Sequence, residues 1–116
     1  MIKRMKDVKQ AMIYVGLNDS VSHEQKFETE RYISILKKVC KSYRVAFSMN
    51  TIDGGYFHDD GTYVEEKTLV LTLLDVEEKI IDEIAKDLCA FFNQESVMVT
   101  FSPCSVVFVK EGIWDN

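Results

Sequence analysis

Two segments of this chain repeat apolar residues at helical spacing, whereas the segments around them alternate apolar and polar residues. The first stripe lies in residues 29–43 and the second in residues 76–92. Their members are Tyr32, Ile33, Leu36, Val39, Cys40 and Tyr43 in the first, and Ile80, Ile81, Ile84, Leu88, Cys89, Phe91 and Phe92 in the second. A helix with one apolar face must bury it against another layer. The fold therefore needs a sheet that two helices can cover.

The strand-like segments supply that sheet. They are residues 11–17, 45–50, 62–74, 96–101 and 105–109, with Pro103 expected to separate the last two. The second half of residues 62–74 is apolar on both faces, which is typical of a central strand. The order is β-α-β-β-α-β plus one terminal strand. It predicts an α+β, ferredoxin-like fold, an antiparallel sheet with both helices on one face.

The stretch from Asp53 to Lys67 joins the second and third strands. It contains Asp53-Gly54-Gly55 and Asp59-Asp60-Gly61, and both are typical turn sequences. We therefore expect a long hairpin between the second and third of these strands, which carries Tyr56, Phe57 and His58. A hairpin that projects from a small domain usually contacts a subunit, a ligand or a target protein.

Length, charge and cysteines limit the class of protein. The 116 residues suit a single domain at 11–110, with a flexible arm at 1–10 and a tail at 111–116. A net charge of −5 without a concentrated basic face argues against nucleic acid as a partner. No apolar run reaches membrane-spanning length. The odd set Cys40, Cys89 and Cys104 has no C-x-x-C spacing, which favours a reducing, cytoplasmic location.

Sequence motifs for catalysis are missing. There is no Gly-x-Ser-x-Gly, Walker loop or dinucleotide fingerprint. His58 stands beside Asp59 and Asp60, but the other histidine, His23, is distant in sequence and turn chemistry explains the aspartates. We therefore expect no catalytic residue, no metal site and no cofactor, and a protein that is not an enzyme.

The pair Glu65-Glu66 precedes an apolar strand. Successive strand residues point to opposite faces, so one of these carboxylates lies on a face that carries buried leucines further along. One interpretation is a hairpin that extends beyond the core and is solvated on both faces. The other is a carboxylate at a ligand or subunit interface, which would need a hydrogen-bond donor such as a backbone N–H.

Four short motifs, in order, resemble a family of small bacterial and phage-associated domains that has no assigned function. They are Val15-Gly16-Leu17-Asn18-Asp19, Gly55-Tyr56 through Asp60-Gly61, Glu66, and Gln94-Glu95-Ser96-Val97. The element order and long hairpin are also similar to those of the PII signalling proteins and CutA. Those proteins are trimers with ligand clefts between subunits, so the resemblance implies self-association and small-ligand binding.

We accordingly expect a homo-oligomer, with a trimer ahead of a dimer. The sheet face away from the helices needs cover, and it would present Met12, Tyr14, Ala46, Val70, Leu74 and Met98. The leading hypothesis is a non-enzymatic protein that holds a nucleotide-like ligand, with Tyr56, Glu66, Gln94 and Glu95 as ligand-binding residues. The alternative is a protein-binding module, such as a phage or mobile-element inhibitor of a host defence protein.

Overall fold

A computed structural model describes residues 2–4, 7–57, 59–109 and 111 of the chain. Its elements are β1 (Ile2–Arg4), β2 (Val8–Gly16), α1 (Thr29–Ser42), β3 (Ser48–Phe57), β4 (Tyr63–Leu74), α2 (Glu78–Phe91), β5 (Met98–Cys104) and β6 (Val107–Val109). The main sheet has the antiparallel order β3-β4-β2-β5, and β1 pairs with β6 in a separate ribbon. The predicted ferredoxin-like α+β fold with an additional C-terminal strand is confirmed.

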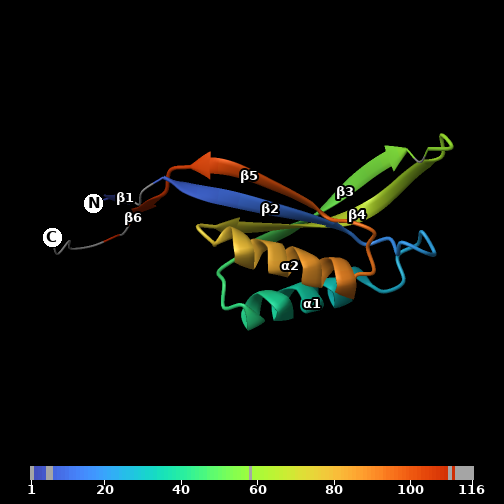
Figure 1. The fold of residues 1–116 in the computed structure, drawn as a ribbon, viewed down its shortest axis with the longest axis horizontal. Coiled ribbons are helices and arrows are strands. Elements are labelled where there is room, and N and C mark those ends of the chain that lie inside the picture. Colours follow the sequence, from blue (N-terminus) through green and yellow to red (C-terminus); the bar gives the residue numbers. More distant parts are fainter. Residues whose placement is uncertain (1, 5–6, 58, 110, 112–116) are drawn as a thin grey trace.

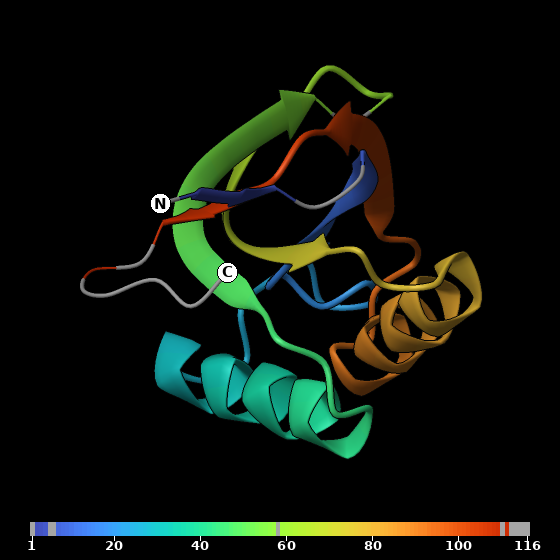
Figure 2. The ribbon, with the colours of Figure 1, turned by 90° about the vertical axis from the view of Figure 1, so that its left-hand side faces the viewer.

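Both helices lie on one face of the sheet, so the domain has two layers (Figures 1 and 2). The core between them contains Ala11, Ile13 and Val15 from β2, Leu69, Leu71 and Leu73 from β4, and the buried stripes Tyr32, Leu36, Val39 and Cys40 of α1 and Ile81, Ile84, Ala85 and Leu88 of α2. Each helix begins and ends within two residues of its predicted bounds. The two apolar stripes alone determined where the helices form.

The opposite face of the sheet is open. Residues on β2 alternate, so Met12 and Tyr14 point away from the helices while Ile13 points toward them. Val70 on the open face is buried, but Met98 is 56% exposed and Leu74 is 38% exposed. Part of the apolar surface expected on this face is therefore present, but Ala46 precedes β3 and lies outside the sheet.

The β3–β4 hairpin is longer than its turn residues indicate. We expected Asp53, Gly54 and Gly55 to form turns, but they lie inside β3 and pair with β4. The reversal comes later, around Asp59–Thr62, where Gly61 has a φ of +89°. Gly55 instead makes room for an aromatic ring, because a side chain there would collide with the hydroxyl of Tyr63.

One further prediction about local structure was wrong. Pro103 does not separate two strands but lies within β5, paired with Lys9 of β2. An edge strand tolerates proline because one side of its backbone forms no ladder hydrogen bonds. The arm expected over residues 1–10 contains β1 and the start of β2. Of the expected tail, only Glu111 lies within the described residues.

The molecule is elongated, at 60 × 27 × 26 Å (Figure 1). Its radius of gyration is 17.1 Å, against about 13 Å for a compact chain of this length. The β1–β6 ribbon extends one end of the sheet and the β3–β4 hairpin extends the other. Among the described residues, neither helix combines the length and apolar character that crossing a membrane requires.

Candidate functional site

Three segments converge beside the point where the β3–β4 hairpin leaves the body. They are the loop after β2, the hairpin strands, and the connection from α2 to β5. They enclose a pocket of about 250 Å³, lined by Asn18, Asp19, Ser20, His23, Tyr56, Glu66, Gln94, Glu95 and Ser96. The four residues predicted to bind a ligand all lie in this lining. That they bind one stays a prediction.

Glu66 reaches into the pocket across the neighbouring strand. It lies on β4, and its carboxylate extends over Gly16 at the end of β2, where its Oε2 accepts a hydrogen bond of 3.1 Å from the backbone N–H of Asn18. A Cβ on Gly16 would lie 2.5 Å from Oε1 and 2.6 Å from Oε2. The missing side chain of Gly16 is therefore what allows the carboxylate to occupy this position. Glu66 is half-buried and accepts from a backbone N–H, which is the kind of donor that a carboxylate at an interface would need.

Tyr56 stands near Glu66 on the adjacent strand. It is paired with Val64, two residues from Glu66 on β4, and the residue is 40% exposed. Burial, followed by the negative charge of Glu66, raises the pKa of the Tyr56 hydroxyl above its usual value. Both causes favour the protonated hydroxyl, which carries no charge of its own beside the Glu66 carboxylate.

Gln94 and Glu95 come from the α2–β5 connection. The Gln94 side chain donates from Nε2 to the carbonyl oxygen of Asn18 at 2.7 Å and to that of Phe92 at 3.2 Å. These bonds join the loop after β2 to the end of α2. Glu95 is exposed and lies at the rim. Gln94 thus holds the pocket wall together, whereas Glu95 adds negative charge at its entrance.

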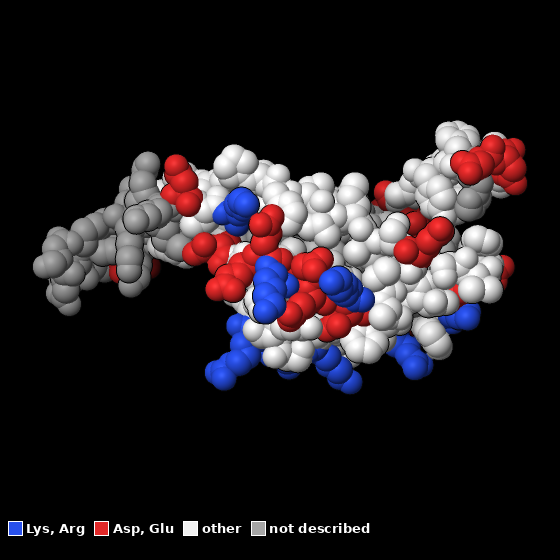
Figure 3. Space-filling view, in the orientation of Figure 1, with Lys and Arg blue, Asp and Glu red and all other residues white. Residues whose placement is uncertain are grey.

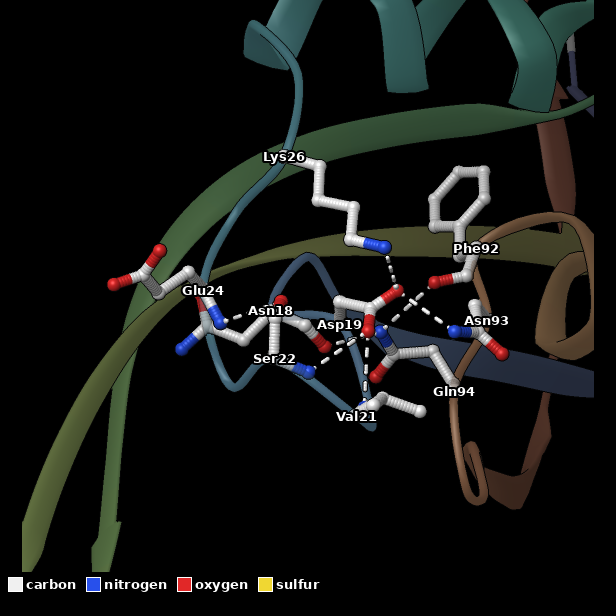
Figure 4. Close-up of polar contacts among 9 residues, drawn as sticks. All are labelled: Asn18, Asp19, Val21, Ser22, Glu24, Lys26, Phe92, Asn93 and Gln94. Atoms are coloured by element: carbon white, nitrogen blue, oxygen red, sulfur yellow. Dashed lines mark hydrogen bonds and ion pairs between the residues drawn. The ribbon is translucent and has the colours of Figure 1, made fainter.

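Asp19 is the residue that organises the wall, and it was not predicted as a site residue. Its side chain accepts hydrogen bonds from the amide of Asn93 at 2.7 Å and from the backbone N–H groups of Val21 and Ser22 at 2.9 and 3.0 Å (Figure 4). Lys26 lies 3.4 Å away. Asp19 is 5% exposed, the only charged residue with so little exposure among those the structure describes. In the sequence, the one indication is the Asn18-Asp19 pair directly after a strand. It does not show which residues contact the Asp19 side chain.

These contacts hold the pKa of the Asp19 carboxyl far below its usual 3.8. The Asn93 amide is the main cause, followed by the N–H groups of Ser22 and Val21, with a smaller effect of Lys26. A folded-state pKa below the unfolded value stabilises the protein at every pH above about 4. That stabilisation is lost as the pH falls from 4 toward the folded-state pKa.

We therefore predict that Asp19→Asn lowers the midpoint of thermal unfolding at pH 7 by roughly 5–10 °C, since a charged acceptor of three hydrogen bonds is lost. The difference from the unmodified chain should shrink as the pH is lowered from 4 to 2. Circular dichroism melts across this range measure it. The control is Asp82→Asn, an exposed carboxylate on α2. A difference that is constant with pH would contradict the assigned role.

The pocket is acidic. Asp19, Glu66 and Glu95 line it, and none of the described lining residues is Lys or Arg. Acidic side chains also gather at the tip of the β3–β4 hairpin beyond it, whereas basic ones follow the edge formed by α1 (Figure 3). The arrangement favours a cationic ligand over an anionic one. Among the described residues, no group of three or more His, Cys, Asp or Glu side chains is placed to hold a metal, and His58 lies outside those residues.

Comparison with known proteins adds the fold relationship. No protein-family model and no curated protein sequence matches the chain. Its structure is similar to a phage SAM lyase in complex with S-methyl-5'-thioadenosine, with a TM-score of 0.65 and 21% identity over 85% of this chain and 88% of that one. A phage SAM lyase in the apo state gives a TM-score of 0.66 and 20% identity, over 93% and 94%. CutA from Synechococcus elongatus PCC7942 gives 0.51 and 13%, over 95% and 82%.

These similarities contradict two of the predictions made from sequence. The hypothesis of a non-enzymatic ligand-binding protein, and with it the expectation that the chain is not an enzyme, conflicts with a fold shared almost end to end with a lyase. The phage-associated alternative agrees better with these findings. The resemblance to a phage-associated, CutA-like domain is confirmed at the level of the fold.

Proposed function

We propose that this chain is a lyase that cleaves S-adenosylmethionine and releases S-methyl-5'-thioadenosine. The observation that supports it most is the Glu66 carboxylate, fixed over Gly16 in an acidic pocket. The fold gives the second support, because the similarity to phage SAM lyase covers at least 85% of either chain. A shared fragment would not extend so far.

The charge of the pocket suits this substrate. S-Adenosylmethionine carries a positive sulfonium next to the bond that breaks, and the pocket offers Asp19, Glu66 and Glu95. Opposite charges increase the rate of encounter and the affinity. The Tyr56 ring supplies an aromatic face on which an adenine can stack.

The reaction balances without a further reactant. The bond between the sulfonium sulfur and the γ-carbon breaks, and its electron pair goes to sulfur, which becomes the neutral thioether of S-methyl-5'-thioadenosine. The four-carbon fragment closes to a lactone if its own carboxylate attacks the γ-carbon, or becomes an alkene if a base removes a β-proton. In the second route Glu66 is the base. In the first it attracts and orients the cation.

Self-association belongs to this proposal. The open sheet face presents Met98 and Leu74, and the ribbon and hairpin extend from both ends of the body. We expect multi-angle light scattering to give a mass that is a multiple of the 13.4 kDa chain, with a trimer ahead of a dimer. A single-chain mass at high micromolar concentration would overturn this part.

A second candidate, binding of a host protein, rests on the tip of the hairpin. Phe57 is 71% exposed and Tyr63 is 53% exposed, and their ring centroids lie 5.2 Å apart. Exposed aromatic pairs of this kind occur in protein interfaces. This candidate leads if the chain proves unable to cleave the substrate.

The test is direct. The purified chain is incubated with S-adenosylmethionine, and S-methyl-5'-thioadenosine and its coproduct are followed by liquid chromatography and mass spectrometry. We expect both products in equal amounts, and the coproduct distinguishes the lactone from the alkene route. Product formation no faster than in a boiled sample would refute the proposed function.

A further inference from the structure

The position of the Glu66 carboxylate depends on a loop residue, Asn18. The Asn18 N–H donates to Oε2 of Glu66 at 3.1 Å. The pairing of β2 with β4 ends just before this residue, and its last bond joins the Leu17 N–H to the carbonyl of Lys67 at 3.0 Å. A β-bridge to Gln25 restrains Asn18 from within its own loop. A restraint from outside the loop has to come from another element.

Gln94 provides that restraint from the end of α2 (Figure 4). Its Nε2 donates to the Asn18 carbonyl at 2.7 Å and to the Phe92 carbonyl at 3.2 Å. A side-chain amide has two N–H groups, so both are used on the backbone and neither is left for a ligand. The Gln94 backbone is itself fixed to α2, because its N–H donates to the Cys89 carbonyl at 2.9 Å and the Cys89 thiol donates to the Gln94 carbonyl at 3.2 Å. The side chain that holds Asn18 is thus attached to a helix of the core.

We infer that Gln94 is a positioning residue for Glu66 and that it acts through Asn18. The carbonyl that Gln94 holds and the N–H that donates to Glu66 belong to the same residue. Holding the carbonyl limits the backbone rotation that would turn this N–H away from the carboxylate. The role of Gln94 in catalysis rests on the proposed function, whereas its effect on the position of Glu66 does not.

The neighbouring residue Asn93 has a different role. It donates to the Asp19 carboxylate at 2.7 Å, and that carboxylate also accepts from two backbone N–H groups of its own loop. These bonds stabilise the loop as a whole. The Gln94 bond instead lies on the residue that donates to Glu66. Its loss should therefore affect the carboxylate more than it affects the rest of the loop.

Hydrogen exchange measured by NMR tests this coupling without an assay of activity. We expect Gln94→Met to speed exchange of the Asn18 amide by about two- to tenfold, the factor that the loss of one hydrogen bond represents. Exchange of the Asp75 amide, which is bonded to the Lys9 carbonyl at the opposite end of β2, should stay unchanged. Gln25→Met is the matched control, because the Gln25 amide also donates two hydrogen bonds, neither of them to Asn18.

A second variant, Gln94→Glu, is measured in parallel. Its carboxylate keeps the length of the side chain but cannot donate to the Asn18 carbonyl, so we expect exchange of the Asn18 amide to speed up in this variant too. The two variants change the polarity of the side chain in different ways and share only the loss of the donor.

Kinetics test the consequence for the proposed reaction. Displacement of a catalytic group by about 1 Å can lower the rate by about 100-fold, so we expect Gln94→Met to lower kcat/KM by about 10- to 100-fold. In the Glu66→Gln background the same substitution should lower it by less than about twofold, because the carboxylate on which Gln94 acts is already gone. A Gln94 side chain that only stabilised the fold, or that bound the substrate directly, would give the same loss in both backgrounds.

The coupling is refuted if the Asn18 amide exchanges at its original rate in both Gln94 variants, or if Gln25→Met speeds it as much. The positioning role is refuted if the loss of kcat/KM persists in full beside Glu66→Gln. If exchange of the Asn18 amide rises as expected but the unmodified chain does not cleave S-adenosylmethionine, the proposed reaction fails and the coupling stands.

Discussion

Glu66→Gln reduces kcat/KM for release of S-methyl-5'-thioadenosine by about 100-fold or more, the size of effect that removing a general base or a charged active-site group produces. The amide has nearly the shape of the carboxylate, and its oxygen still accepts the hydrogen bond from the Asn18 N–H. The fold should therefore persist while the charge is lost. Initial rates over a range of substrate concentrations measure the effect, and a thermal melt verifies that the variant is folded.

The distribution of the loss between kcat and KM reveals what the carboxylate does. Attraction of the cation affects substrate and transition state alike and changes KM, whereas removal of a proton changes kcat. Glu28→Gln is the control, because Glu28 is exposed and makes no side-chain hydrogen bond at the start of α1. A Glu66→Gln variant with more than a third of the original kcat/KM would exclude a role for Glu66 in the reaction.

Gly16→Ala should lower the rate by about 10- to 100-fold, which corresponds to a loss of about 1.4–2.7 kcal/mol of transition-state stabilisation. The free energy of unfolding should stay almost unchanged. The new Cβ would meet Glu66 Oε1 at 2.5 Å and displace the carboxylate from its place beside Asn18. Displacement by about 1 Å is enough for a loss of this size. The free energy of unfolding changes little because the atoms that the new Cβ would meet are at the end of the flexible Glu66 side chain, which can move away. Alanine is also favoured over glycine in a strand.

A loss of activity without a loss of thermal stability would identify Gly16 as a residue that positions the Glu66 carboxylate. Gly54→Ala is the matched control, since Gly54 pairs with Glu66 across β3 and β4 and its Cβ would meet Thr68 Oγ1 at an ordinary 3.4 Å. Rates and melting temperatures of the two variants are compared side by side. If Gly16→Ala is as active as Gly54→Ala, the position of Glu66 over Gly16 does not matter for the reaction.

If these variants behave as expected, Gly16 has a different role from Gly61, whose φ of +89° suits glycine at the turn of the hairpin. It adopts strand geometry within β2 and pairs with Thr68, so no unusual backbone conformation demands it. Its absent side chain serves the neighbouring strand instead. Such a role is invisible in local sequence, because it depends on which residue lies across the ladder.

The alternation of side chains along the strand predicted part of the position of the Glu66 carboxylate. Period-two spacing places Glu65 and Glu66 on opposite faces, and in the structure Glu65 is exposed whereas Glu66 is half-buried. It could not show that the Glu66 side chain would extend over Gly16 to the N–H of Asn18, 48 residues away in sequence. The register between β2 and β4 decides that contact.

Turn-forming residues predicted the local structure less well than the spacing of apolar residues did. Asp53-Gly54-Gly55 has a typical turn composition, yet continuous pairing with β4 keeps it in β3. Cross-strand hydrogen bonds and the Tyr63 ring over Gly55 prevailed over local preference. Pro103 likewise stays in a strand because β5 is at an edge of the sheet.

The sequence by itself determined the layers of this protein. Apolar spacing predicted both helices and the face that the central strands bury, because burial of apolar surface depends on periodicity along the chain. Only the tertiary structure decided the site. Asp19 and Asn93 lie 74 residues apart, and Asn18 and Gln94, which also join in the pocket wall, lie 76 residues apart. Contacts between loops depend on how whole elements pack, and no local pattern encodes them.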